Sequence, residues 1–233
     1  MEQSNTVKSS ILFFVYKWYN LIMVKKIIKE NYIYIISIIT LIILFTIVKN
    51  STLYYRILAF DKKIIGYRNT IQNEPLTIAF KNITFFGDYY IPILIIVCIF
   101  IFNKKKSLAY VNAVNYISVV IVTFITKITI NRARPEFSLI AIPDKYSFPS
   151  GHTLTSIVFY TFLCYVATKN RKTRKYLLPL IIVVLLSISI SRIYLGVHYF
   201  SDVIGAIMIS IPLLLMNINI YEKNIKERLK WRH

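Results

Sequence analysis

Charged and titratable side chains occur in three short segments where apolar runs of the sequence end. One segment, SRIYLGVHYFSD at residues 191–202, contains Arg192, His198 and Asp202. An ionised side chain at the bilayer centre costs at least ~2.5–3.5 kcal/mol on insertion scales, so a function is the default expectation for such residues. His198 and Asp202 lie one helical turn apart, so the carboxylate can bond one ring nitrogen and leave the other free to attack. A buried structural pair is the alternative for this segment alone. Gly196 favours a break in the helix between Arg192 and His198.

The second segment, KITINRARP at residues 127–135, is basic and contains Lys127, Arg132 and Arg134. On a helix Lys127 and Arg134 are about two turns apart and would share one face. A basic helix end whose side chains reach toward lipid headgroups is the alternative.

The third segment, SFPSGHT at residues 147–153, directly precedes an apolar run. We therefore expect Ser150, Gly151 and His152 at the start of a helix, where free backbone N–H groups and the helix dipole favour an anion. Gly151 lets the backbone approach a ligand closely. A capped helix with an incidental histidine is the alternative.

The three segments together suggest a site for a tetrahedral anion. His152, His198 and Asp202 could instead ligate a metal, since two histidines and a carboxylate form a known triad. We favour phosphate over metal, because cationic side chains would converge on one pocket with only one assigned carboxylate. These cations are Lys127, Arg132, Arg134 and Arg192. The sequence therefore predicts a site without a metal or cofactor.

Phosphoryl transfer requires charge stabilisation, a nucleophile and a proton for the leaving group. His198, held by Asp202, is the predicted nucleophile, and His152 is the predicted acid that later activates water. The predicted phosphate contacts are Lys127, Arg134, Arg192 and the backbone at Ser150 and Gly151, with Arg132 in support.

The composition is typical of an all-α polytopic membrane protein. The chain has 233 residues and is 56% hydrophobic, and its mean hydropathy is +0.57. Six apolar runs are long enough, or nearly so, to cross ~30 Å of hydrocarbon as helices. They lie near residues 32–48, 89–102, 108–126, 153–167, 177–191 and 203–216.

The net charge of +19 would suggest nucleic acid if the basic residues formed a single patch. Instead, 18 of the 29 lie before the first span, between spans two and three, between four and five, and after the sixth. By the positive-inside rule both termini are cytoplasmic and the three segments face outward. The expected outer loop at residues 49–88 adds basic residues that oppose this assignment, but long loops weigh less in the rule.

Residues 1–30 are predicted to be an interfacial and cytoplasmic segment that contains an N-terminal interfacial helix. Residues 31–218 are predicted to form the six-helix domain, and 219–233 a basic cytoplasmic tail. The two cysteines, Cys98 and Cys164, fall inside predicted spans and indicate no disulfide framework.

In combination the segments resemble the signature of the type 2 phosphatidic acid phosphatase (PAP2) superfamily of membrane lipid phosphatases. The matching residues are Lys127 with six residues before Arg134 and Pro135, PSGH at 149–152, and SR at 191 with five residues before His198 and three before Asp202. TFFGDYY at 84–90 is similar to a glycine-containing stretch of that family. The resemblance covers roughly residues 30–218.

The resemblance implies a metal-independent phosphatase that acts through a phosphohistidine at His198 in the plasma membrane. Undecaprenyl diphosphate is the favoured substrate by analogy with small bacterial members, and phosphatidylglycerophosphate and phosphatidic acid are alternatives. A rival of another class is an anionic-lipid-binding protein or transporter without turnover. The charged groups lie toward span ends rather than at the broken central helices of a transporter, which favours the enzyme. The oligomeric state stays open.

Overall fold

The computed structural model of the chain describes residues 51–230 except 105, 143, 169 and 170, together with nine residues between 32 and 47. For residues 171 and 224–230 only the backbone is described. The interfacial helix predicted at 1–30 lies outside the described residues. The nine residues within the first predicted span, 32–48, are all helical.

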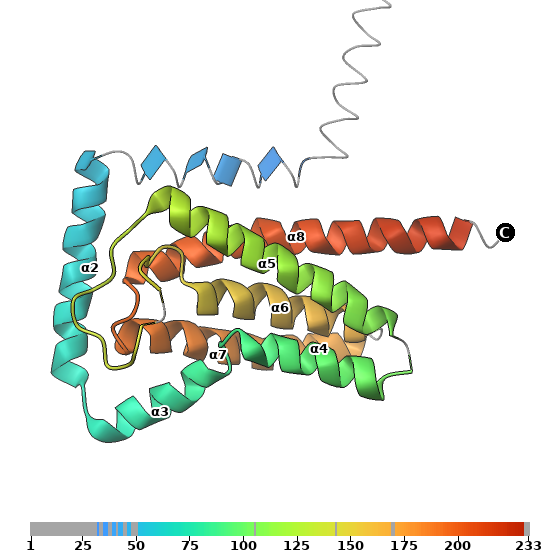
Figure 1. Cartoon of the computed structure of the whole chain (residues 1–233), viewed down its shortest axis with the longest axis horizontal. Helices are drawn as coiled ribbons and strands as arrows, with labels where there is room; N and C mark the ends of the chain where they lie inside the picture. The colour runs from blue at the N-terminus through green and yellow to red at the C-terminus, as the bar shows by residue number, and fades with distance from the viewer. Residues whose placement is uncertain are drawn as a thin grey trace, which may run out of the picture.

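The described part of the chain contains seven named helices and no named strand. They are α2 (Ser51–Ile71), α3 (Glu74–Phe85), α4 (Tyr90–Phe102), α5 (Ser107–Ile130), α6 (Gly151–Ala167), α7 (Arg171–Tyr194) and α8 (Phe200–Lys230). α4 to α8 run side by side along the long axis, while α2 lies across one end of this bundle and α3 leads from α2 to α4 (Figure 1). The all-α prediction is confirmed for these residues.

The described part of the expected outer loop at 49–88 consists mostly of two helices, α2 and α3. Asn73 caps α3, because its side chain accepts the N–H of Leu76 at 2.9 Å. Buried polar groups hold α2 against the bundle, since Asp61 and Arg68 are 0% and 5% exposed. This segment was not recognised as helical because its polar residues find their partners only in the tertiary structure.

Three described helices are long and apolar enough to cross a membrane: Ser107–Ile130, Lys172–Tyr194 and Phe200–Lys223. The pair α3 and α4 passes the same test as one span with a bend of 45°. α6 is apolar but has only 17 residues, the lower limit for a spanning helix. Six spans therefore stay a prediction.

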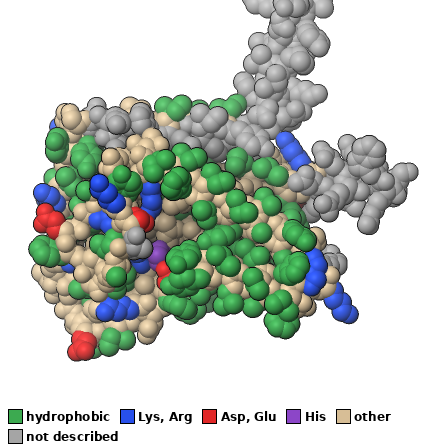
Figure 2. Space-filling view, viewed as in Figure 1, with side chains coloured by type: hydrophobic (Ala, Val, Ile, Leu, Met, Phe, Trp, Pro, Cys, Tyr) green, Lys and Arg blue, Asp and Glu red, His purple; other side chains and the backbone are tan. Residues whose placement is uncertain are grey.

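The outside of the bundle is apolar. Phe102 is 81% exposed, and Tyr110, Val114 and Phe124 of the neighbouring α5 are between 62% and 67% exposed. Hydrophobic side chains cover the middle of the face seen in Figure 2, while Lys and Arg lie at its two ends. An apolar patch of this extent is the surface that an integral membrane protein presents to lipid.

α6 is the centre of the bundle and packs against α5, α7 and α8. Leu154 and Val158 of α6 meet Val119 of α5 and Ile209 of α8 in the largest buried cluster. Farther along, Asn217 Nδ2 of α8 donates hydrogen bonds to α5, to Asn115 Oδ1 at 2.6 Å and Ser118 Oγ at 3.0 Å. Polar contacts of this kind connect helices in a bundle where lipid gives no hydrophobic driving force.

Gly205 of α8 sets the position of the chain just before α6. A Cβ on Gly205 would lie 2.3 Å from Cε2 of Phe148, so the aromatic ring packs directly on the helix backbone. Phe148 is 4% exposed and belongs to the main core cluster. This contact fixes the chain two residues before Ser150.

Candidate active site

The basic segment after α5 reverses direction as soon as the helix ends. Asn131 follows Ile130 with a left-handed φ of 52°, and its N–H donates to the carbonyl of Lys127. Lys127 therefore lies in the last helical turn, whereas Arg134 lies in the loop. The expectation that they share one helix face is wrong, because the left-handed residue ends the helix between them.

A carboxylate from the same loop nevertheless joins the two cations. Lys127 Nζ lies 2.6 Å from Asp144 Oδ2, and Arg134 Nη2 lies 2.8 Å from Asp144 Oδ1. Arg134 Nε also donates to the backbone carbonyl of Asp144 at 2.9 Å. The side chains of Lys127 and Arg134 are 13% and 8% exposed, while that of Asp144 is 46% exposed. Two predicted phosphate contacts thus converge on one oxyanion, which is a carboxylate of the protein itself.

His198 lies in a turn between α7 and α8. α7 ends at Tyr194, and Gly196 follows with a positive φ of 72°. A Cβ at Gly196 would lie 2.4 Å from the backbone oxygen of Phe137, which together with the positive φ means that the turn requires glycine. The N–H of His198 donates to the carbonyl of Arg192 at 3.3 Å. The expected break between Arg192 and His198 is confirmed.

The two ring nitrogens of His198 face opposite charges. Nδ1 lies 3.6 Å from Oδ2 of Asp202, within ion-pair range but longer than a hydrogen bond. Nε2 lies 3.4 Å from Nη1 of Arg134. Because a guanidinium only donates, this contact favours a lone pair on Nε2 and a proton on Nδ1.

The surroundings of His198 keep its ring neutral. Its pKa falls to about 3, chiefly because burial disfavours the charged ring. Asp202 opposes this shift, while the positive charges of Arg134 and Arg192 add to it. Near neutral pH the imidazole is therefore uncharged, with Nε2 directed at a cation that was expected to bind phosphate.

Arg132 is held by two carboxylates. Its Nη1 donates to Oδ1 of Asp202 at 2.5 Å, and its Nη2 donates to Oδ2 of Asp61 at 2.7 Å. Asp61 comes from α2 and also accepts hydrogen bonds from the N–H and the hydroxyl of Ser201. Arg132 therefore does not share the Asp144 carboxylate with Lys127 and Arg134. Arg132 instead contacts Asp202, whose other oxygen faces the His198 ring.

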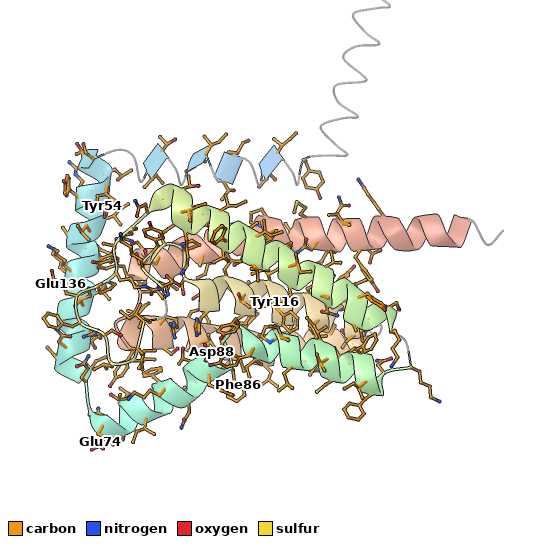
Figure 3. The ribbon with its side chains drawn as sticks, in the orientation of Figure 1. Tyr54, Glu74, Phe86, Asp88, Tyr116 and Glu136 are labelled. Atoms are coloured by element: carbon orange, nitrogen blue, oxygen red, sulfur yellow. The ribbon has the colours of Figure 1, made fainter. Side chains whose placement is uncertain are left out.

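The start of α6 agrees with the predicted arrangement in most respects. Ser150 is the N-cap residue, and Gly151 and His152 open the helix. The N–H of Ser150 donates to the carbonyl of Asp202 at 3.2 Å, so this expected phosphate donor is engaged within the protein. His152 Nε2 lies 3.0 Å from Oδ1 of Asp88, at the junction of α3 and α4 (Figure 3). The carboxylate orients the His152 ring.

Arg192 lies near both histidines. It lies in the last turn of α7, is 3% exposed, and donates from Nη1 to the hydroxyl of Thr84 at 2.6 Å. Its charge acts electrostatically on both His152 and His198. The structure therefore brings the three predicted segments together at one end of the bundle.

Three carboxylates at the site are not among the candidates from the sequence: Asp61, Asp88 and Asp144. The chain has only ten Asp and Glu residues, so their rarity was a usable signal. With Asp202, the site therefore has four carboxylates. The predicted cations of the site are also four: Lys127, Arg132, Arg134 and Arg192. The expectation of four cations facing a single carboxylate is therefore wrong.

The structure does not group His152, His198 and Asp202 as ligands of one metal ion. His152 pairs with Asp88, while His198 faces Asp202. Across residues 51–223, as far as they are described, no three His, Cys, Asp or Glu side chains are arranged to hold a metal ion.

An apolar cavity of about 390 Å³ lies between α2 and α8, next to Arg132 and Ser201. Its lining includes Tyr54, Ile57 and Phe60 of α2 and Phe200, Ile204 and Met208 of α8. This volume and this lining suit a hydrocarbon chain better than a polar ligand.

Sequence comparisons agree with the signature. Residues 107–226, just over half of the chain, match the family model described as the PAP2 superfamily. A curated relative, phosphatidylglycerophosphatase B of Bacillus subtilis (strain 168), is 33% identical over 103 residues. That match covers 42% of this chain and 49% of the relative, so the chain spans about half the length of the relative it matches.

Two solved structures share the fold. A transmembrane PAP2 type phosphatidylglycerolphosphate phosphatase from Bacillus subtilis superposes with a TM-score of 0.70 at 22% identity, covering 84% of this chain and 97% of that one. Aquifex aeolicus LpxE gives a TM-score of 0.53 at 21% identity, covering 67% and 93%. At these identities the likeness establishes the fold alone.

Proposed function

The chain belongs to the PAP2 superfamily, and from that premise we propose that it is a metal-independent phosphatase of membrane lipids. The observation that carries the proposal is the environment of His198. Its Nε2 faces Arg134 at 3.4 Å, its Nδ1 faces Asp202, and the ring is neutral near neutral pH. A neutral imidazole beside an oxyanion site is suited to attack phosphorus.

The proposed reaction has two steps. In the first, the Nε2 lone pair of His198 forms a bond to phosphorus, the bond from phosphorus to the leaving oxygen breaks, and His152 gives that oxygen a proton. In the second, His152 takes a proton from water, the water oxygen attacks the phosphohistidine, and inorganic phosphate leaves with cleavage of the P–N bond. Lys127, Arg134 and the N–H of Gly151 would stabilise the phosphoryl oxygens in both steps.

Arg192 completes the proposed set of phosphate contacts. Its charge acts on both histidines, which suits a group that neutralises a phosphoryl oxygen lying between them. Arg132 would support the nucleophile indirectly, because it holds the Asp202 carboxylate at 2.5 Å.

The substrate is proposed to be a lipid with a terminal phosphate. Undecaprenyl diphosphate is the expectation from the sequence, but the relative named phosphatidylglycerophosphatase B gives phosphatidylglycerophosphate at least equal support. The apolar cavity beside Arg132 supports a substrate with a hydrocarbon chain.

The experiment is phosphate release by the purified protein in detergent with EDTA. The substrates are phosphatidylglycerophosphate, undecaprenyl diphosphate and phosphatidic acid, each measured with the wild type and with His198→Ala. We expect release from at least one lipid by the wild type and a loss of at least ~1,000-fold in the variant. No release from any of the lipids, or equal release by the variant, rejects the proposal.

A binding protein or transporter that lacks turnover is the second candidate. It predicts phosphate binding that survives both His152→Ala and His198→Ala, together with no phosphate release. The pairing of each histidine with its own carboxylate favours the enzyme, because anion binding alone does not require oriented imidazoles.

The proposed organisation is one phosphatase domain at 31–218 with six spans, an interfacial segment at 1–30 and a cytoplasmic tail at 219–233. The active site would face the outside of the plasma membrane. To test this, Lys145, beside Asp144, is replaced by cysteine in a chain with Cys98→Ser. Labelling by an impermeant maleimide in intact cells supports the orientation, whereas labelling only after lysis reverses it.

A further inference from the structure

The contacts of Asp144 make this residue the most unusual feature of the site. Its two carboxylate oxygens are shared between Lys127 and Arg134, at 2.6 and 2.8 Å. These are charge-assisted contacts of the length that the same cations would make with phosphate oxygens. The Asp144 carboxylate therefore occupies the position expected for part of the substrate.

The loop that carries Asp144 is fastened at its base and open at its tip. Ser147 N donates to the carbonyl of Arg132 at 2.8 Å, and Ala133 and Tyr146 form an isolated antiparallel bridge. By contrast, the Asp144 side chain is 46% exposed, while the cations it contacts are nearly buried. Asp144 Oδ1 also accepts the N–H of Tyr146 at 3.2 Å, and this contact is lost when the carboxylate turns out to water. The hydrogen bond from Ser147 N to Arg132 does not involve the carboxylate and can stay in place.

The charge of Asp144 persists under physiological conditions. Burial raises the pKa of its carboxyl, but hydrogen bonds and charges from Lys127 and Arg134 outweigh burial and leave the pKa below its usual value. Near neutral pH the Asp144 carboxylate is therefore negatively charged and available to both Lys127 and Arg134.

We propose that Asp144 is an internal competitor for the phosphate subsite, which any incoming phosphate must displace from Lys127 and Arg134. This inference rests on the proposed function for the identity of the subsite. The apparent dissociation constant of an anion is its intrinsic value divided by the fraction of molecules whose cations are free of Asp144. The internal carboxylate therefore weakens the binding of every anion by the same factor.

A uniform weakening has a specific consequence at a membrane surface. Ordinary phospholipid headgroups are phosphodiesters with one negative charge and two free oxygens, much like a carboxylate. A terminal phosphate carries ~1.5–2 charges and three acceptor oxygens, so it binds the cations more tightly. With Asp144 in place, the abundant diesters fall below the affinity needed to fill the subsite, and the product phosphate also leaves more readily.

The experiment measures equilibrium binding rather than turnover. Isothermal titration calorimetry in detergent gives dissociation constants for inorganic phosphate and for dimethyl phosphate, a diester probe. The proteins are the wild type, Asp144→Asn, Asp144→Ala and Glu136→Gln. Glu136 lies in the same loop and is exposed (Figure 3), so its variant removes one negative charge without changing a described contact of Lys127 or Arg134.

Both Asp144 variants are expected to bind phosphate roughly 3- to 30-fold more tightly, since two partly buried ion pairs no longer compete. The dissociation constant of dimethyl phosphate should fall by the same factor as that of inorganic phosphate, to within about twofold. Glu136→Gln should change neither dissociation constant. Unchanged or weaker phosphate binding by both variants overturns the proposal and makes Asp144 a residue that positions the cations. An equal gain in Glu136→Gln, or no measurable binding by any of the four proteins, also overturns it.

Phosphate release by the wild type separates this inference from the proposed function. Tighter binding by the Asp144 variants without release from any lipid phosphate supports the internal competitor and rejects the phosphatase. Release with unaltered binding constants does the reverse. A thermal unfolding midpoint for each variant confirms that binding is compared between folded proteins.

Discussion

Asp61→Asn tests whether the helix that crosses the end of the bundle supports the proposed nucleophile. Asp61 is fully buried, and its side chain accepts hydrogen bonds from Arg132 Nη2 at 2.7 Å, Ser201 N at 3.0 Å and Ser201 Oγ at 2.5 Å. Asparagine keeps the shape but has no charge and only one acceptor oxygen. Removing one partner of a buried ion pair costs ~3–5 kcal/mol, and Arg132 keeps Asp202, so we expect a loss of about 2–4 kcal/mol in the free energy of unfolding.

The same substitution should lower kcat. Without Asp61 the whole guanidinium charge of Arg132 acts on Asp202. This stronger attraction draws the Asp202 carboxylate away from the His198 ring. We expect kcat for a lipid phosphate to fall about tenfold while KM stays within about twofold, since the phosphate contacts are unchanged. Denaturation in mixed micelles and steady-state phosphate release measure the two effects.

The matched control is Glu74→Gln, which neutralises an exposed carboxylate on the neighbouring α3. It should lower the free energy of unfolding by no more than ~0.3–1 kcal/mol, because Glu74 lies in the first turn of α3, where it interacts with the helix dipole. A double-mutant cycle of Asp61→Asn with Arg132→Gln should be non-additive by ~1–3 kcal/mol. If Asp61→Asn matches the control in both stability and kcat, or if the cycle is additive, then the buried contact does not act as described.

Three further outcomes are expected. Gly205→Ala places a methyl group 2.3 Å from the Phe148 ring and should destabilise the protein by ~1–3 kcal/mol, read as a lower thermal unfolding midpoint. Asn217→Leu removes the hydrogen bond to Asn115 and should cost ~0.6–1.7 kcal/mol in mixed-micelle denaturation. Because the pKa of His198 is about 3 in the folded protein and 6.5 for an ordinary histidine in water, stability should fall as the pH drops from about 6.5 toward 3, and His198→Gln should flatten that part of the profile. A pH profile identical in wild type and variant would contradict the neutral, buried ring.

The apolar runs allowed the bundle to be located in the sequence, because hydrophobic length alone reports a spanning helix. They did not show where the polar ends of the helices lie. α5 continues to Ile130, past its expected end at 126, and so includes Lys127. The spacing from Lys127 to Arg134 reflects a chain reversal at Asn131 and not a helical face, and periodicity cannot distinguish the two.

The signature residues were predictable, whereas their carboxylate partners were not. Spacing identified His198 and Asp202, since they lie on consecutive turns of the chain. Asp61 and Asp144 reach the site from segments 141 and 58 residues before Asp202. No local pattern connects Asp61 to Arg132, which lie 71 residues apart, so that pair becomes visible only when the helices are assembled. Asp144 lies only ten residues after Arg134, but its contact depends on the fold of an irregular loop, which has no periodicity to read.

The four carboxylates that accompany Lys127, Arg132, Arg134 and Arg192 bear on how the bundle assembles. Four uncompensated positive charges at a bilayer surface would require a bound counter-ion before the helices could close around them. Here Asp61, Asp88, Asp144 and Asp202 supply the opposing charge from within the polypeptide. The closing of the helices around these four cations therefore does not depend on a bound phosphate to neutralise them.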